Sequence, residues 1–202
     1  MILIRLLNAL QGIHFIYENL MVMTAVVLIY PPVILSLLQK KQLGYLDVSI
    51  KKINKAILTF FVVSVVIFLP AFLINHFYQT ILMHTAFHEG RSEVWGPFLL
   101  SQFLLVAFPE EFFFRGFLQE AFSDVLPKRM RFFGVEIGWG LVVVSLIFAF
   151  SHSLITLRAW HALIFFPGLV FGWLKEKTGT IWAGTLFHGT CNVFAYWVSL
   201  HY

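Results

Sequence analysis

Residues 109–119 read PEEFFFRGFLQ and close an apolar run that begins near Pro97. Two adjacent carboxylates and a guanidinium among phenylalanines are costly in any apolar medium, above all inside a lipid bilayer. The simplest interpretation is that the protein uses Glu110, Glu111 and Arg115 for chemistry. The alternative is a buried ion pair that only fixes the register of a helix.

Helical spacing gives the two glutamates different roles. Side chains four residues apart lie on one face of a helix, whereas neighbours point about 100° apart. Glu111 therefore faces Arg115, and the acid lies on the N-terminal side, which favours the ion pair. Glu110 has Val106 and Phe114 one turn away, so we expect its carboxylate to be free to meet other helices as a general base.

Composition indicates a membrane protein. Of 202 residues, 59% are hydrophobic and 12% are charged, about half the charged fraction of an ordinary soluble domain. Several apolar segments approach or exceed the roughly 18 residues that are needed to cross a bilayer. We expect an all-α fold, a polytopic transmembrane helical bundle that forms a single integral membrane domain over residues 1–202. The motifs lie in a catalytic core at about residues 96–200.

About six spans are expected, and seven are possible. Residues 1–18 fit an N-terminal amphipathic segment at the interface, which could add the seventh crossing. Pro31-Pro32 should kink or break the first span. The expected spans cover residues 19–38, 56–74, 96–122, 138–153, 159–174 and 181–200, with a turn at 175–180.

The distribution of basic residues predicts topology rather than binding of nucleic acid. The loops after the first, third and fifth spans carry ten of the 14 Lys and Arg residues. The positive-inside rule places these loops in the cytoplasm and both termini on the opposite face. The basic residues do not interleave with a polar surface that could follow a phosphate backbone, so no nucleic acid partner is expected.

Two later spans carry histidines. Phe148 precedes His152 by one helical turn, and His188 precedes Asn192 by the same spacing. A lone histidine on an apolar helix is more often a satisfied core residue than a catalyst, but here two lie in separate spans. Each must face the bundle interior to avoid hydrocarbon, as must the glutamates. We therefore expect Glu110 and these polar residues to converge on one intramembrane site.

The chemistry of such a site divides in two. A glutamate and a histidine can hold a water molecule and deprotonate it, which gives a nucleophile at neutral pH. A histidine and an asparagine supply N–H donors to the oxyanion that forms when this water attacks an amide carbonyl. Together these groups are the parts of a peptidase that forms no covalent intermediate.

Three ordered patterns resemble the motifs of the CPBP family, which comprises CAAX prenyl proteases of the Rce1 type and bacteriocin-processing proteins, also called Abi proteins. The resemblance covers about residues 108–192, in the order and spacing of the family. The patterns are E-E-x-x-x-R at residues 110–115, F-x-x-x-H at 148–152 and H-x-x-x-N at 188–192, with similar segments at 168–172 and 178–182.

The resemblance implies a glutamate-dependent intramembrane endopeptidase. By matching positions, Glu110 and His152 activate water, and His188 with Asn192 stabilises the oxyanion. Glu111 and Arg115 complete the first motif. The implied substrate is a membrane-anchored protein or peptide, and the implied location is a bacterial inner membrane, which the chain crosses several times.

No cofactor is expected from this mechanism. The family has long been described as metallopeptidases, and Glu110, His152 and His188 have the side-chain types that bind zinc. Zinc is therefore the alternative. His84 and His88, with Glu89 beside them, could also bind a metal, although a solvated loop or an interfacial helix is the favoured interpretation.

Other functions are compatible with the same residues. A non-catalytic membrane protein, such as a bacteriocin immunity factor, a scaffold or a proton-coupled carrier, could use the same buried acids and histidines. The single cysteine, Cys191, excludes an intramolecular disulfide and could serve as a nucleophile, but a small packing side chain is the simpler interpretation. Gly168 and Gly172 predict close helix packing within the bundle rather than dimerisation.

Overall fold

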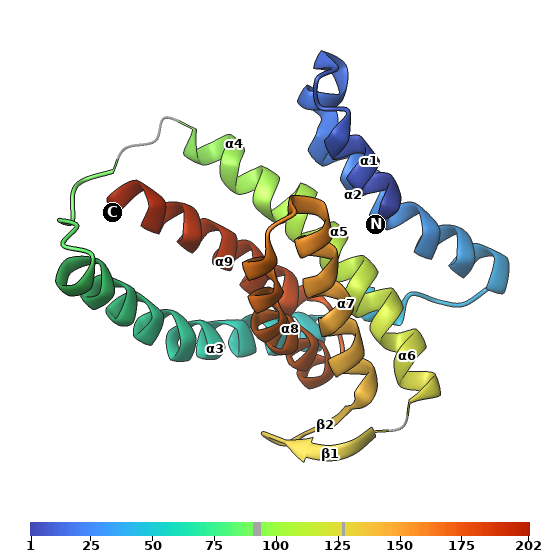
Figure 1. Cartoon of the computed structure of the whole chain (residues 1–202). Coiled ribbons are helices and arrows are strands. Elements are labelled where there is room, and N and C mark those ends of the chain that lie inside the picture. Colours follow the sequence, from blue (N-terminus) through green and yellow to red (C-terminus); the bar gives the residue numbers. More distant parts are fainter. Residues whose placement is uncertain (91–93, 127) are drawn as a thin grey trace.

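The computed structural model describes residues 1–90, 94–126 and 128–202. The chain folds into a bundle of helices with one small hairpin at its edge (Figure 1), which confirms the predicted all-α fold. The α-helices are α1 (Ile2–Ala9), α2 (His14–Gln39), α3 (Ile50–Phe77), α4 (Trp95–Leu100), α5 (Phe108–Glu111), α6 (Gln119–Val125), α7 (Trp139–Thr156), α8 (Phe165–Thr178) and α9 (Trp182–His201). Short 3-10 helices lie at η1 (Gly44–Leu46) and η5 (Ala159–Ile164), and π-helical segments at η2 (Tyr78–Leu82), η3 (Ser101–Ala107) and η4 (Phe112–Leu118).

Four helices of the described residues are long and apolar enough to cross a membrane. Two of the six predicted spans correspond instead to α8 and α9. With 14 residues, α8 is shorter than the roughly 20 that a bilayer requires, while α9 carries the polar residues His188 and Asn192. The four helices are His14–Gln39, Ile50–Leu82, Trp95–Val125 and Trp139–Thr156.

Of the kink or break predicted at Pro31-Pro32, the break was wrong. Helix α2 runs from His14 to Gln39 with both prolines inside it. Helices in membranes tolerate proline where neighbouring helices and local backbone adjustment satisfy the freed carbonyl groups. Pro32 is buried in the bundle, which fits this explanation.

The helix that carries the first motif runs without interruption from α4 to α6 and contains two π-helical segments. These segments, η3 and η4, flank the short α5, which has Pro109 in its first turn. A proline inside an α-helix lacks its N–H and clashes with the carbonyl four residues earlier. The wider π-helical turn before Pro109 relieves this clash, and such turns are frequent at functional sites.

The hairpin after α6 was not predicted. Strands β1 (Lys128–Phe132) and β2 (Val135–Gly138) pair antiparallel, with Phe132 opposite Val135. Phe133 and Gly134 between them have φ values of 45° and 75°, as a two-residue hairpin turn requires. The sequence alone predicts only a basic connection in this segment.

The turn predicted at residues 175–180 was also placed wrongly. Helix α8 continues to Thr178 and ends at Gly179, whose φ of 76° is typical of a C-terminal cap. The helix can include these charges because Lys175 is only 8% exposed and its Nζ lies 3.5 Å from Glu176 Oε1 and 3.7 Å from Glu120 Oε1. Paired acids replace water around the ammonium group.

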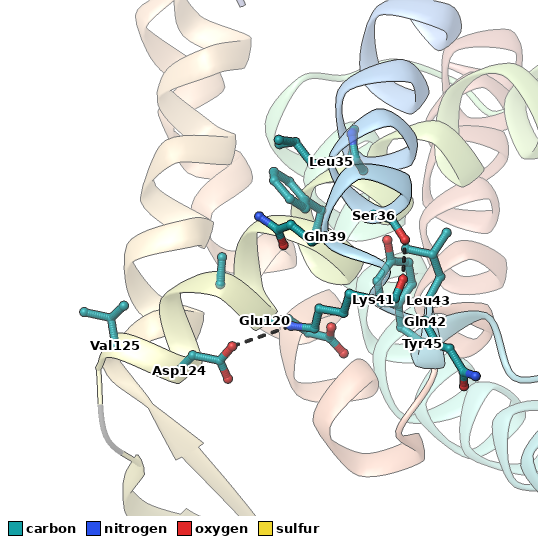
Figure 2. A pocket seen from close by; sticks show the side chains of 13 residues that line it. Leu35, Ser36, Gln39, Lys41, Gln42, Leu43, Tyr45, Glu120, Asp124 and Val125 are labelled. Atoms are coloured by element: carbon teal, nitrogen blue, oxygen red, sulfur yellow. Dashed lines mark hydrogen bonds and ion pairs between the residues drawn. The ribbon is translucent and has the colours of Figure 1, made fainter.

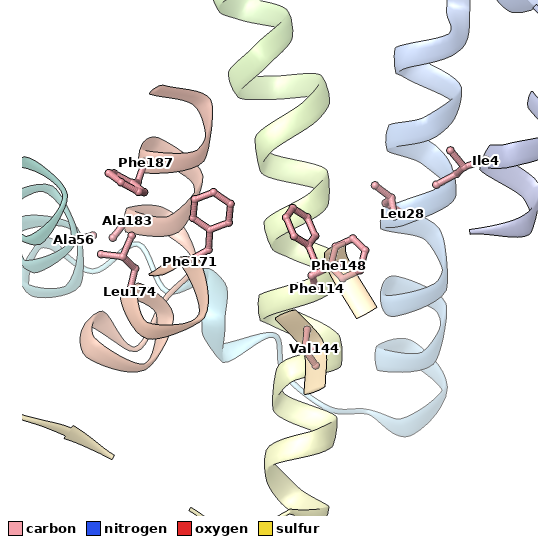
Figure 3. Packing of buried hydrophobic residues seen from close by; sticks show 10 residues of the cluster. All are labelled: Ile4, Leu28, Ala56, Phe114, Val144, Phe148, Phe171, Leu174, Ala183 and Phe187. Atoms are coloured by element: carbon pink, nitrogen blue, oxygen red, sulfur yellow. The ribbon is translucent and has the colours of Figure 1, made fainter. Parts of the chain in front are cut away.

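Aromatic rings form the centre of the core and lie beside the motif helices (Figure 3). The rings of Phe114 and Phe148 meet edge to face at 4.9 Å, and Phe148 contacts Phe171 in the same way at 6.1 Å. Because η4, α7 and α8 each contribute one ring, the core fixes the three elements relative to one another. The N-terminal α1 packs Ile4 into the same cluster, and Arg5 donates a hydrogen bond to the carbonyl of Ile155.

Gly116 gives a test of this packing. A Cβ at Gly116 would lie 2.5 Å from the ring of Tyr45, so we expect Gly116→Ala to lower the free energy of unfolding by about 1–3 kcal/mol. Gly96 lies in the same long helix, and a Cβ added there would have no neighbour within 4 Å among the described residues, so Gly96→Ala should be neutral or slightly stabilising. Thermal unfolding in detergent measures both, and equal stabilities would contradict the packing described.

Candidate active site

The carboxylate of Glu110 lies between two imidazole rings. Its Oε2 is 3.6 Å from Nε2 of His152 and 3.7 Å from Nε2 of His188. These residues come from α5, α7 and α9, so side chains from three separate helices come together around one oxygen atom. Oε2 is buried and has no hydrogen-bond partner among the described residues. Both distances are longer than a hydrogen bond, so the Glu110 carboxylate lies between the two imidazole rings without a hydrogen bond to either ring.

A backbone contact fixes the proton on His152. Its Nδ1 lies 2.9 Å from the carbonyl oxygen of Phe148, one turn earlier in α7. A carbonyl only accepts, so Nδ1 carries the hydrogen and the neutral ring presents a lone pair at Nε2 toward Glu110. The ring also packs against that of Phe148, with centroids 4.5 Å apart. The side chain is 25% exposed, so this side of the site is reached from outside.

A carboxylate fixes the other histidine. Nδ1 of His188 lies 3.1 Å from Oε1 of Glu111, so Nδ1–H donates to the acid and Nε2 again faces Glu110. The ring stacks on Phe171 with centroids 4.7 Å apart and an interplanar angle of 13°. The two adjacent glutamates therefore contact opposite nitrogens of the same imidazole ring.

Arg115 holds Glu111 in place, as the four-residue spacing predicts. Its Nε lies 3.6 Å from Oε2 of Glu111, and both side chains are fully buried. Nη2 donates to the carbonyl of Gly168 at 3.2 Å, and the guanidinium carbon lies 4.2 Å from the ring centroid of Phe148. A cation over an aromatic face is stabilised further. The ion pair thus ties the motif helix to α7 and α8.

Asn192 lies one turn after His188 on α9, and its amide has a different partner. Its Nδ2 donates to Oε1 of Gln102 at 3.0 Å, while Glu110 contacts the two histidines. Gln102 was not singled out from the sequence. A glutamine within the apolar run before Pro109 was the available signal, since a polar side chain there requires a partner.

Glycines let α8 approach polar side chains of the motif helix. Gly168 leaves a Cβ position 3.4 Å from Nη2 of Arg115, and Gly172 leaves one 2.8 Å from Oε1 of Gln119. Close packing within the bundle, as predicted for this pair, is therefore confirmed. Gly184 of α9 serves Glu111 in the same way, since a Cβ there would lie 2.9 Å from Oε2.

The remaining candidates lie elsewhere or stay predictions. His84 is exposed, and the backbone N–H of His88 donates to the carbonyl of His201 at 3.1 Å. Cys191 is half-buried in α9. Within the described part of the chain, no group of three or more His, Cys, Asp or Glu side chains is arranged to hold a metal ion.

A double-mutant cycle tests the buried pair. Arg115→Met leaves the Glu111 carboxylate buried without its cation, so we expect the free energy of unfolding to fall by about 3–5 kcal/mol. Adding Glu111→Gln removes the unpaired charge and should restore much of that loss. Thermal or denaturant unfolding of the single and double variants in detergent measures the coupling. Simple additivity of the two substitutions would contradict a direct interaction.

Comparison with known proteins identifies the family. The family model described as type II CAAX prenyl endopeptidase Rce1-like matches residues 92–194, just over half of the chain, and the matched part contains all three motifs. No curated protein and no solved structure matches. This chain, an integral membrane protein by its apolar helices, belongs to the Rce1-like family of type II CAAX prenyl endopeptidases.

Proposed function

We propose that the protein is an intramembrane endopeptidase in which Glu110 and His152 activate a water molecule to attack a peptide bond. The observation that carries this proposal is the position of Glu110 Oε2, buried and nearly equidistant from Nε2 of His152 and of His188. Membership of a protease family supports the reaction class.

The geometry supports a water between Glu110 and His152. An ionised carboxylate and the Nε2 lone pair of His152 are both acceptors, so they cannot bond to each other but can each accept one hydrogen of the same water. As the water oxygen bonds to the substrate carbonyl carbon, Glu110 takes its proton and the carbonyl electrons move to oxygen. Protonated Glu110 then delivers the proton to the departing amine as the C–N bond breaks.

His188 and Asn192 supply the oxyanion donors. Nδ1–H of His188 already donates to Glu111, so donation from Nε2 requires a second hydrogen on the ring. The Asn192 amide has two N–H groups, and Gln102 accepts only one of them. The second N–H is the proposed partner of the oxyanion. Each such donor is worth about 10²–10³ in kcat.

The surroundings strengthen these interactions. Phe148 and Phe171 pack against the two catalytic histidines and lower the local dielectric, which increases the effect of each fixed charge and dipole. We propose a membrane-anchored protein or peptide as the substrate, a bacterial inner membrane as the location, and no nucleic acid partner.

Removal of the proposed base is the first test. Glu110→Gln keeps the size of the side chain but cannot accept a proton, so we expect turnover to fall by about 10²–10⁴. Comparative membrane proteomics of cells with wild-type protein and with Glu110→Gln should then show a precursor that accumulates. Glu136→Gln, which changes a carboxylate in the hairpin strand β2, is the matched control and should leave processing normal.

If Glu110→Gln inserts into the membrane and unfolds at the wild-type temperature, yet the biological activity of the protein is retained, a non-catalytic role replaces the peptidase.

A second set of changes separates the glutamate mechanism from its rivals. With the accumulated precursor as substrate, Asn192→Ala should lower kcat by about 10²–10³ with little change in KM. Cys191→Ser and treatment with a metal chelator should leave kcat at the wild-type level. Loss of activity with Cys191→Ser would point to a cysteine nucleophile, and loss on chelation that zinc reverses would point to a metal.

A further inference from the structure

A cavity of about 360 Å³ opens at the end of the bundle where α2 and α6 finish (Figure 2). Its volume falls within the range of small-molecule sites. Its apolar walls include Leu35 of α2 and Phe117 of η4. Its polar groups come from the end of α2, from the segment after it and from α6, and they include Lys41, Tyr45, Glu120 and Asp124.

Tyr45 contributes a buried hydroxyl that lacks a partner. The side chain is 3% exposed, and its oxygen makes no hydrogen bond with any described residue. Its ring makes an edge contact with Phe112 and occupies the space that a side chain at Gly116 would fill. Burial, together with the charge of Glu120, raises the pKa of Tyr45 well above its usual range. The group is therefore a neutral O–H, and a buried hydroxyl of this kind requires a polar partner.

The charged groups around the cavity have a negative excess. Among its lining residues are two carboxylates, Glu120 and Asp124, and one ammonium, Lys41. Lys175 lies outside the lining and is shared by Glu120 and Glu176, so three carboxylates face two ammonium groups in this cluster. Lys41 Nζ lies 3.7 Å from Asp124 Oδ2 at the rim, where both side chains are largely exposed (Figure 2). Exposed pairs of this kind exchange partners at little cost. An occupant that carries a cation would match the excess charge, and an anion on the same molecule would match Lys41.

The position of the cavity identifies the class of occupant. Helix α2 and the helix Trp95–Val125 are both long and apolar enough to cross a membrane, and both end at the cavity. Leu38 and Val125 at these ends are 74% and 77% exposed, while Lys40 and Lys41 follow Leu38 closely in the sequence. Exposed apolar residues followed by lysines are typical of the headgroup level of a bilayer. The molecules present at that level are lipids.

We propose that this cavity binds a phospholipid whose headgroup carries a primary ammonium, as in phosphatidylethanolamine. One acyl chain lies against Leu35 and Phe117, and the ammonium lies between the carboxylates of Glu120 and Asp124. Lys41 pairs with the phosphate, and the Tyr45 hydroxyl donates to a phosphate or ester oxygen. This site does not depend on the proposed peptidase activity, because it shares no residue with the catalytic groups.

Lipid titration of the purified protein in detergent tests the proposal. Native mass spectrometry gives the apparent Kd for phosphatidylethanolamine, phosphatidylglycerol and phosphatidylcholine with identical acyl chains. We expect phosphatidylethanolamine to bind at least about tenfold more tightly than the other two. Asp124→Asn and Glu120→Gln should each weaken its binding about tenfold. Glu18→Gln, at the opposite end of α2, is the control and should change nothing.

Tyr45→Phe separates a ligand contact from a structural role. Without lipid, removing an unpaired buried hydroxyl should leave the unfolding temperature unchanged or raise it. With saturating phosphatidylethanolamine, the variant should gain a smaller thermal shift than the wild type. Equal affinities for the three lipids, tighter binding of phosphatidylglycerol, or phosphatidylethanolamine binding that none of the three substitutions weakens would each overturn the proposal.

Discussion

The structure depends on the burial of one ion pair, Glu111 with Arg115. Both side chains are excluded from solvent, and charges in such a position are stable only when partners satisfy them. Arg115 reaches the carbonyl of Gly168 and the ring of Phe148, while Glu111 reaches His188. These contacts join the motif helix to α7, α8 and α9. The pair therefore positions His188 and holds the motif helix against the helices that carry His152 and Asn192.

The proposed catalytic groups are arranged around that pair in order of increasing exposure. Glu111 is fully buried, His188 is nearly so, and His152 is 25% exposed at the outer side of the site. The fixed charges thus lie behind the reacting groups, where they orient one imidazole ring without meeting substrate. Glu110 lies between the rings, and its Oε2 accepts no hydrogen bond from any described residue. A buried, ionisable group with an acceptor free in this way is suited to take a proton from water.

Sequence reasoning predicted the parts of this arrangement that follow from helical periodicity and from the cost of burying charge. The facing of Glu111 and Arg115 is a matter of spacing alone, and the convergence of Glu110 with two histidines follows from their exclusion from lipid. The partner of Asn192 could not be predicted, because Gln102 lies 90 residues away and only the tertiary fold joins them. The turn predicted at residues 175–180 was wrong for the same reason. Lys175 lies inside α8 because its acidic partner Glu120 comes from another helix, which the local sequence does not reveal.

We propose that Glu110 and His152 share one water molecule, with Nε2 of His188 at the same point. An experimental structure in lipid, at a resolution that shows ordered water, tests it most directly. We expect a water within hydrogen-bond distance of Glu110 Oε2 and His152 Nε2, with His188 Nε2 facing the same space. A Glu110 carboxylate bonded directly to either imidazole ring, or turned away from both, would contradict the claim.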